Sequence, residues 1–306
     1  MEEQVKIKKN KVKFVDRTFF VLIAAFFIIC VGQPLGNIIY NALSSLGDAI
    51  FPGFASTPAW RILSLYLPFI GIWIVGVGLL AITPSGRTIN KSLWNGLKGN
   101  TVKMLVIGLA LGLVMNLVCA FAAMLNGDIA LRYDSFKPIS FLIIFVFVFV
   151  QSAAEEFICR GYIFQKLIKR YNKPVLAGVI NAAFFSFIHL ANPGVTPMSL
   201  LNIFLYGLLF SALVIYLDSI WVAMAAHATW NFCQNIILGL PNSGMVSPYS
   251  VFKLDAAAAT DSFAYSVSFG LEGTITACLV LIVATVLIYL YGTKKGIKPT
   301  DIWANN

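Results

Sequence analysis

The pattern of hydrophobic and polar positions divides the chain into eight long apolar stretches. They cover approximately residues 19–40, 62–83, 103–124, 138–165, 174–191, 198–217, 220–239 and 267–291. A helix needs about 20 predominantly apolar residues to cross the hydrocarbon core of a bilayer. Because each stretch approaches or exceeds this length, the pattern predicts an all-α fold. We expect a polytopic membrane helix bundle with about eight transmembrane helices.

The composition supports a lipid environment. Hydrophobic residues make up 59% of the chain and charged residues only 11%, whereas about a quarter of a typical soluble domain is charged. So few charges cannot cover a surface in water, which excludes a soluble enzyme and a free nucleic-acid-binding protein. We therefore expect a multi-pass protein of the plasma or cell membrane that contacts the lipid bilayer and binds no nucleic acid. The sequence predicts no particular oligomeric state.

The distribution of basic residues predicts the orientation. Most of the 22 Lys and Arg residues lie in the N-terminal segment (Lys6 to Arg17), after the second and fourth stretches, and in the C-terminal tail. The alternate connections hold only Arg61, Arg132, Lys137 and Lys253. By the positive-inside rule, both termini are expected in the cytoplasm. Three regions follow: 1–137 with the basic segment and three spans, 138–240 with a four-span core, and 241–306 with an external loop, the last span and the tail.

Polar residues that are costly in lipid concentrate in the fourth, fifth and seventh stretches, and such residues usually pair or line a functional cavity. They are Glu155, Glu156, Arg160, His189, His227 and Asn231. Residues four apart share a helical face, so Glu156 is expected to pair with Arg160. Glu155 is rotated by about 100° from Glu156 and is expected to remain available as a base. A rise of about 1.5 Å per residue puts the groups of all three helices at overlapping depths.

These side chains favour activation of water. A carboxylate, two imidazoles and an amide, with no suitable Ser or Cys nucleophile, are typical of general-base chemistry with oxyanion stabilisation. Cys159 lies next to Arg160 and is expected to pack, not to attack a substrate. The residues alone therefore predict hydrolysis of an amide bond at membrane depth.

Three segments resemble the motifs of a known family. Residues 155–160 (Glu-Glu-Phe-Ile-Cys-Arg) match EExxxR, residues 185–189 (Phe-Ser-Phe-Ile-His) match FxxxH, and residues 227–231 (His-Ala-Thr-Trp-Asn) match HxxxN. In this order they resemble the CPBP family, which includes the Abi proteins and the type II CAAX prenyl endopeptidases. The resemblance covers about residues 138–240.

The resemblance implies a role for each residue of the motifs. Glu155 would activate water together with His189, and His227 and Asn231 would stabilise the oxyanion. The implied catalytic set is Glu155, Glu156, Arg160, His189, His227 and Asn231, with the Glu–Arg pair in support. The implied function is an intramembrane endopeptidase that cleaves membrane-embedded peptides or lipidated, CAAX-like proteins.

The resemblance leaves the metal requirement open, because the family is often labelled metalloprotease-like. Glu155, His189 and His227 have the residue types of a His₂Glu zinc site. The sequence has no HExxH motif, and a water held by Glu155 and His189 needs no metal. We therefore expect that no cofactor is required, with a divalent metal such as zinc as the alternative.

Two functions of other classes compete with the protease. One is a catalytically silent bacteriocin-immunity or regulatory scaffold of the same fold, and the other is a proton-coupled transporter, since buried Glu and His also form proton relays. The complete set of motifs favours the enzyme, because a scaffold does not need all six polar residues. Outside the motifs, Glu272 is expected at the membrane interface, Asp218 in a solvated turn or helix cap, and Asn116 as a hydrogen-bonding contact between helices.

Overall fold

The computed structural model describes residues 14–304, and most of them are helical. In chain order the α-helices are α1 (Thr18–Ile50), α2 (Pro58–Leu63), α3 (Phe69–Ile82), α4 (Pro84–Lys91), α5 (Val102–Leu125), α6 (Pro138–Glu156), α7 (Phe164–Tyr171), α8 (Pro174–Ile188), α9 (Pro197–Leu217), α10 (Ile220–Phe232) and α11 (Ile275–Lys294). Three π-helical segments, Ser92–Gly96, Phe157–Ile163 and Cys233–Ile237, extend α4, α6 and α10. The basic residues at positions 6–13, which contributed to the predicted orientation, lie outside the described residues.

Five helical segments of the described chain are long and apolar enough to cross a membrane. They are α1, α5, the continuous segment Pro138–Tyr171, α9 and α11. The shorter helices α3 and α8 are also apolar. The all-α membrane bundle is therefore confirmed, while the count of eight crossings and the side of the termini stay predictions.

The second predicted span is not one helix, and this part of the prediction is wrong. α2 ends at Leu63, and a series of turns leads to Pro68, which precedes α3. Proline lacks an N–H group and disfavours α-helical geometry in the residue before it. The hydrophobic pattern continues through this break, because the turn residues are themselves mostly apolar.

Local sequence sets most helix ends. Proline occupies the first turn of five helices, where its missing N–H costs no hydrogen bond. Hydroxyl side chains cap several helices by accepting a backbone N–H, among them Thr101, Thr196, Ser219 and Thr274, as expected for N-cap residues. α7 and α9 end in left-handed residues, Asn172 and Asp218. Short connections therefore bring consecutive helices back against one another.

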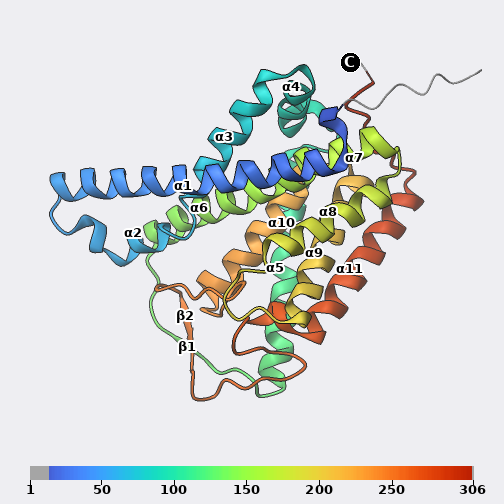
Figure 1. Cartoon of the computed structure of the whole chain (residues 1–306). Coiled ribbons are helices and arrows are strands. Elements are labelled where there is room, and N and C mark those ends of the chain that lie inside the picture. The colour runs from blue at the N-terminus through green and yellow to red at the C-terminus, as the bar shows by residue number, and fades with distance from the viewer. Residues whose placement is uncertain (1–13, 305–306) are drawn as a thin grey trace, which may run out of the picture.

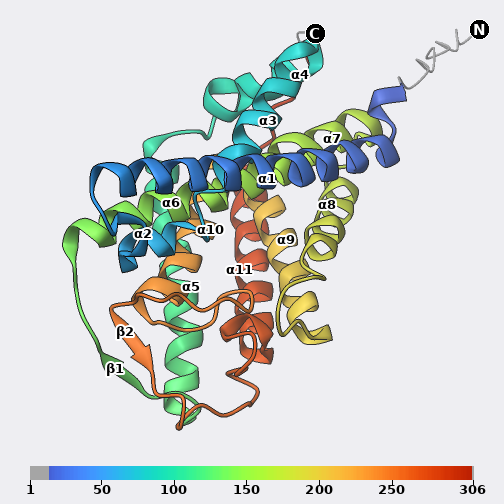
Figure 2. The same ribbon diagram turned by 60° about the vertical axis from the view of Figure 1, so that its left-hand side comes forward.

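α10 occupies the centre of the bundle. It packs between α5 and α6, while α8 packs against α9, α9 against α11, and α1 against α3. Figures 1 and 2 show α1 and α6 side by side across one end of the bundle that contains α5, α9, α10 and α11. At Gly112 of α5, a Cβ atom would overlap the backbone of Ala226. Glycine therefore permits the close α5–α10 approach at the residue that precedes His227.

A short ribbon, absent from the all-α prediction, joins two connections far apart in sequence. Strand β1 (Leu131–Tyr133) pairs antiparallel with β2 (Phe252–Leu254), with Arg132 opposite Lys253. Strands of three residues are too short to show a clear alternation of polar and apolar positions. The ribbon anchors the long loop 238–274, which folds back under the bundle (Figure 2).

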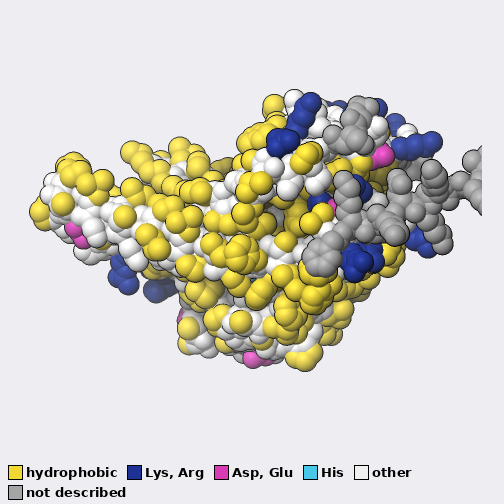
Figure 3. Space-filling view, turned by 45° about the horizontal axis from the view of Figure 1, so that its top comes forward, with side chains coloured by type: hydrophobic (Ala, Val, Ile, Leu, Met, Phe, Trp, Pro, Cys, Tyr) yellow, Lys and Arg dark blue, Asp and Glu magenta, His cyan; other side chains and the backbone are white. Residues whose placement is uncertain are grey.

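The surface is largely apolar. Figure 3 shows one face covered mainly by hydrophobic side chains, with most of its Lys and Arg gathered toward the right and a smaller group at the lower left. Exposed large side chains on α1, α5 and α11 include Phe26, Phe121 and Leu287. A contiguous apolar surface of this kind is unfavourable in water and suits a lipid environment.

Candidate functional site

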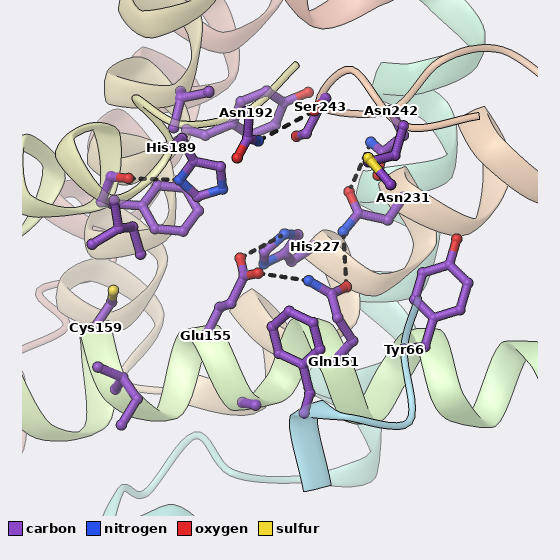
Figure 4. Close-up of a pocket in the computed structure, with 18 of the residues that line it drawn as sticks. Tyr66, Gln151, Glu155, Cys159, His189, Asn192, His227, Asn231, Asn242 and Ser243 are labelled. Carbon is purple, nitrogen blue, oxygen red and sulfur yellow. Dashed lines mark hydrogen bonds and ion pairs between the residues drawn. The ribbon is translucent and has the colours of Figure 1, made fainter. Parts of the chain in front are cut away.

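A cavity of about 340 Å³ lies where α6, α8, α9, α10 and the 238–274 loop meet. Four of the six residues predicted from the sequence line it: Glu155, His189, His227 and Asn231. Figure 4 shows Glu155, His189 and His227 pointing into the same space. The other two, Glu156 and Arg160, are fully buried behind the cavity wall. The structure therefore brings all six residues into one region.

Glu156 and Arg160 form the predicted pair. Glu156 Oε1 lies 3.0 Å from Arg160 Nη1, and both side chains are 0% exposed. Arg160 also donates from Nη2 to the carbonyl of Gly207 at 3.1 Å, and its guanidinium lies over the Phe185 and Phe210 rings at 4.7 and 5.3 Å. This pair therefore ties the π-helical segment after α6 to α8 and α9.

His227 connects the two glutamates. Its Nδ1 lies 3.0 Å from Glu156 Oε1, and its Nε2 lies 3.8 Å from Glu155 Oε2. Because the Glu156 carboxylate already accepts a hydrogen bond from Arg160, it favours the tautomer in which His227 donates from Nδ1. The Nε2 atom then faces Glu155. This bridge was not predicted from the sequence, because residues on different helices have no spacing that reports their contact.

Glu155 is held differently from its neighbour. Its Oε1 accepts a hydrogen bond from Gln151 Nε2 at 2.6 Å, and its side chain is 14% exposed. Among the described residues no Lys or Arg forms an ion pair with it. The Glu155 carboxylate therefore faces the cavity without a permanent counter-charge.

His189 ends α8 and turns one ring nitrogen away from the cavity. Its Nδ1 lies 2.7 Å from the carbonyl oxygen of Phe185. Since a carbonyl can only accept, Nδ1 carries the proton and Nε2 is the acceptor of the neutral ring. The Phe185 ring packs edge-on against His189, with the two ring centres 4.7 Å apart. In the described chain Glu155 is paired with His227 and not with His189, so the shared water of Glu155 and His189 stays a prediction.

Asn231 belongs to a chain of amides that reaches Glu155. Its Nδ2 donates to Gln151 Oε1 at 3.3 Å and to Ser152 Oγ at 3.2 Å. Its Oδ1 accepts from Asn242 Nδ2 at 3.2 Å. Gln151 therefore links Asn231 to Glu155, a connection that the sequence analysis missed. The contact between Gln151 and Glu155 could have been predicted from the sequence, because Gln151 lies one helical turn before Glu155 on the same face.

Glu272, expected at the membrane interface, is buried inside the protein, while its depth in a membrane stays a prediction. Its side chain is only 4% exposed and lines the cavity. It accepts hydrogen bonds from Trp230 Nε1 at 3.1 Å, Asn242 Nδ2 at 2.9 Å and the Ser243 backbone N–H at 2.7 Å. The 238–274 loop folds back onto α10, and this long-range fold buries a residue that sequence position puts near a span end.

Two further expectations have different outcomes. Asp218 does end a helix, but it is buried and not solvated, since it accepts from the Lys98 backbone N–H at 3.1 Å and the Thr300 hydroxyl at 2.6 Å. The predicted role of Asn116 is confirmed, because its Nδ2 donates to Gln234 Oε1 at 3.0 Å. Both residues join segments distant in sequence.

A metal ion would need several ligating side chains close together. Within residues 14–304, no three His, Cys, Asp or Glu side chains are grouped closely enough to hold one. Glu155 and His227 are neighbours, but His189 does not complete the set with them. The His₂Glu arrangement considered from the sequence is therefore not assembled here, and no chemical step is derived through a metal.

Comparison with known families adds independent support. Residues 137–233 match the model described as "Type II CAAX prenyl endopeptidase Rce1-like". This segment, about a third of the chain, contains α6 to α10 and all six predicted residues. The match supports the resemblance of this core to the CPBP family, whose CAAX-type members are intramembrane proteases. A search of curated proteins found no match to the chain.

Proposed function

We propose that this protein is an intramembrane endopeptidase in which Glu155 activates the hydrolytic water. One observation supports this proposal above the others. Glu155 belongs to the candidate membrane span Pro138–Tyr171 and faces the cavity next to the Nε2 atom of His227, with no Lys or Arg partner among the described residues. A carboxylate in this setting is free to take up a proton, as a general base must.

The positions of these groups support the following reaction. Glu155 takes a proton from water as the water oxygen attacks the scissile carbonyl carbon. The carbonyl oxygen becomes an oxyanion. It accepts a hydrogen bond from Asn231 Nδ2, once one of the two N–H groups of that amide turns from Gln151 or Ser152 to the substrate, and a second from Nε2 of a doubly protonated His227. The protonated Glu155 then gives its proton to the leaving amine as the C–N bond breaks. His189 Nε2 orients the water from the opposite side of the cavity.

The substrate class follows from the rest of the lining. Apolar side chains from α1, α3, α6, α8 and α9 form much of the wall, including Ile29, Phe69, Ile158, Ile188 and Ile203. Apolar pockets with a few polar groups bind ligands of similar character. We infer a membrane-embedded peptide or a lipidated, CAAX-like protein as the substrate, with an apolar group next to the scissile bond.

The decisive experiment compares wild-type protein with the Glu155→Gln variant in proteoliposomes that contain a fluorogenic lipidated peptide. Glutamine keeps the size and polarity of glutamate but cannot accept the proton, so turnover should fall at least about 10²-fold. The melting temperature should stay near that of wild type. Asp134→Asn, a change at an exposed carboxylate, serves as the matched control and should keep full activity.

Two outcomes would redirect the proposal. Full activity of Glu155→Gln would contradict the protease mechanism, and an unchanged biological effect without any cleavage would favour the silent scaffold. Wild-type activity should survive a chelator. Activity that is lost with the chelator and restored by zinc would overturn only the metal-free form of the mechanism.

A further inference from the structure

A tight turn from the 238–274 loop closes one side of the cavity. Asn242 and Met245 exchange backbone hydrogen bonds of 2.9 Å in both directions. Between them, Ser243 and Gly244 both have positive φ angles, 49° and 81°, as in a type I′ turn. Asn242, Ser243 and Met245 all line the cavity. The turn therefore forms part of the surface that a substrate would contact.

Ser243 adopts a left-handed backbone conformation, which non-glycine residues rarely use. Such a conformation persists only where the surroundings enforce it. The Ser243 N–H and hydroxyl both donate to Glu272 Oε2, at 2.7 and 2.9 Å, and its carbonyl accepts from Asn192 Nδ2 at 3.2 Å. Glu272 is thus the main anchor of the turn.

The second carboxylate oxygen of Glu272 reaches the predicted catalytic residues. Its Oε1 accepts from Trp230 Nε1 at 3.1 Å and from Asn242 Nδ2 at 2.9 Å. The same Asn242 nitrogen lies 3.2 Å from Asn231 Oδ1. Glu272 therefore binds both the turn, through Asn242, and α10, through Trp230. It lies outside the segment that matches the family model.

All four groups bonded to Glu272 are donors, so the site requires two acceptor oxygens. Only a carboxylate supplies two acceptors of this shape, because a glutamine amide has one acceptor oxygen and one donor nitrogen. No ion pair joins Glu272 to a basic side chain in the part of the chain that the structure describes. The charge is therefore stabilised by the hydrogen bonds of the turn and Trp230.

We infer that Glu272 is a positioning residue that holds the Asn242–Met245 turn as the substrate-facing wall of the cavity. This inference rests on the proposed function for its kinetic consequence. It does not place Glu272 in contact with the reacting atoms. A weakened wall lowers binding in the ground state and the transition state alike, which raises KM more than it lowers kcat.

The first test is kinetic and uses Glu272→Gln in proteoliposomes, with activity expressed per folded molecule. We expect KM to rise about tenfold or more and kcat to fall less. Ser243→Ala removes one of the two bonds to Oε2 and should raise KM by a smaller factor. The double variant should resemble Glu272→Gln alone, because the two residues act through one contact. Asp255→Asn, an exposed carboxylate of the same loop, should match wild type.

The second test needs no activity. Amide hydrogen exchange at residues 242–245 should be about tenfold faster in Glu272→Gln, or in Ser243→Ala if the first variant does not fold, while α6 and α10 keep their protection. Unchanged exchange of the turn would overturn the inference. A lower kcat per folded molecule with an unchanged KM would also overturn it, since that pattern reports loss of an interaction made only in the transition state. Wild-type protein without peptidase activity would contradict the proposed function, and the exchange result would still decide the role of Glu272.

Discussion

Two buried polar clusters in this protein use their carboxylates in opposite ways. The first is the cavity cluster, made of Gln151, Glu155, His227 and Asn231. The second, named the tail cluster, consists of Asp16, Lys166, Lys169 and Trp303. Each joins segments that are far apart in the sequence, and each contains a carboxylate that is largely withdrawn from solvent.

The carboxylate of the tail cluster is fully compensated. Asp16 Oδ1 lies 2.7 Å from Lys166 Nζ, and Oδ2 lies 3.1 Å from Lys169 Nζ. The Lys169 ammonium also lies 4.6 Å from the centre of the Trp303 ring. Burial alone would raise the pKa of Asp16, but hydrogen bonds and charge from the two lysines outweigh it and lower the pKa below its ordinary value of 3.8. This cluster keeps Asp16 ionised and attaches the segments around Asp16 and Trp303 to α7.

In the cavity cluster, one glutamate forms the ion pair and the adjacent glutamate remains without a cation. Glu156 takes the permanent counter-charge of Arg160 and orients His227. Glu155 retains only an amide and the second nitrogen of that imidazole as neighbours. A buried carboxylate therefore stabilises the structure where cations pair with both of its oxygens. It becomes available for proton transfer where the adjacent residue takes the cation.

The largest effect should come from removing either partner of the compensated pair beside the cavity. In Glu156→Ala, Arg160 and His227 lose their shared acceptor, and in Arg160→Ala the Glu156 charge remains buried without its cation. Breaking a buried ion pair in this way costs about 3–5 kcal/mol. We therefore expect a large fall in folded protein for both variants, measured as detergent-solubilised yield and melting temperature.

An exposed ion pair supplies the matched control. Asp134 and Lys253 lie 3.0 Å apart with side chains 34% and 41% exposed, and exposed pairs contribute at most about 1 kcal/mol. Asp134→Ala should therefore leave yield and melting almost unchanged. Normal abundance of Glu156→Ala and Arg160→Ala would show that this pair does not support the fold, and the contrast with Glu155 would lose its basis.

The next effect concerns turnover and not stability. Asn231→Ala removes the amide nitrogen that lies 3.3 Å from Gln151 Oε1 at the cavity wall. Loss of one oxyanion donor typically reduces kcat by about 10²–10³-fold. We expect this reduction with little change in KM, measured with the reconstituted protein and the lipidated peptide.

A buried amide away from the cavity provides the control for the Asn231→Ala variant. Asn181 on α8 donates to Ser211 Oγ at 3.1 Å and does not line the cavity. Asn181→Ala should therefore keep wild-type turnover per folded molecule. Equal turnover of the two variants would remove Asn231 from the mechanism and leave His227 as the oxyanion donor.

Hydrophobic pattern and helical spacing predict much of this molecule. The apolar stretches become helices, and the i to i+4 relation finds the Glu156–Arg160 pair, because both signals lie within one segment. The resemblance over the core is confirmed by the family match to residues 137–233. The catalytic roles of the individual residues stay predictions.

The remaining features depend on contacts between segments. His227 meets Glu156 across 71 positions, and Glu272 meets Trp230 across 42. Neither contact leaves a periodic signal, since the fold of the loop and the crossing of the helices create both. The break at Pro68 and the β1–β2 ribbon were missed because short elements carry too few residues for a pattern. The sequence therefore predicts which residues are candidates for the site, and the tertiary structure determines which of them contact one another.

The smallest effect should come from the tail cluster. In Asp16→Asn, the two lysines lose a charged acceptor. Hydrogen bonds to charged groups contribute about 1.5–3 kcal/mol, so stability should fall by about that amount or less near neutral pH. Peptidase activity per folded molecule should stay at the wild-type value, because the tail cluster lies outside the cavity. Chemical or thermal unfolding together with the peptide assay measures both quantities.

The sign of its pH dependence follows from the lowered pKa. In the unfolded chain Asp16 protonates near its ordinary pKa of 3.8, whereas the folded form stays ionised to lower pH. Its contribution is therefore present above about pH 4 and is lost as the pH falls through the folded-state pKa. The stability difference between wild type and Asp16→Asn should shrink over that acidic range, whereas Asp48→Asn, an exposed carboxylate bonded only to a backbone N–H, should show no such trend. A difference that stays constant with pH would mean that packing, and not charge, fastens the two ends of the chain.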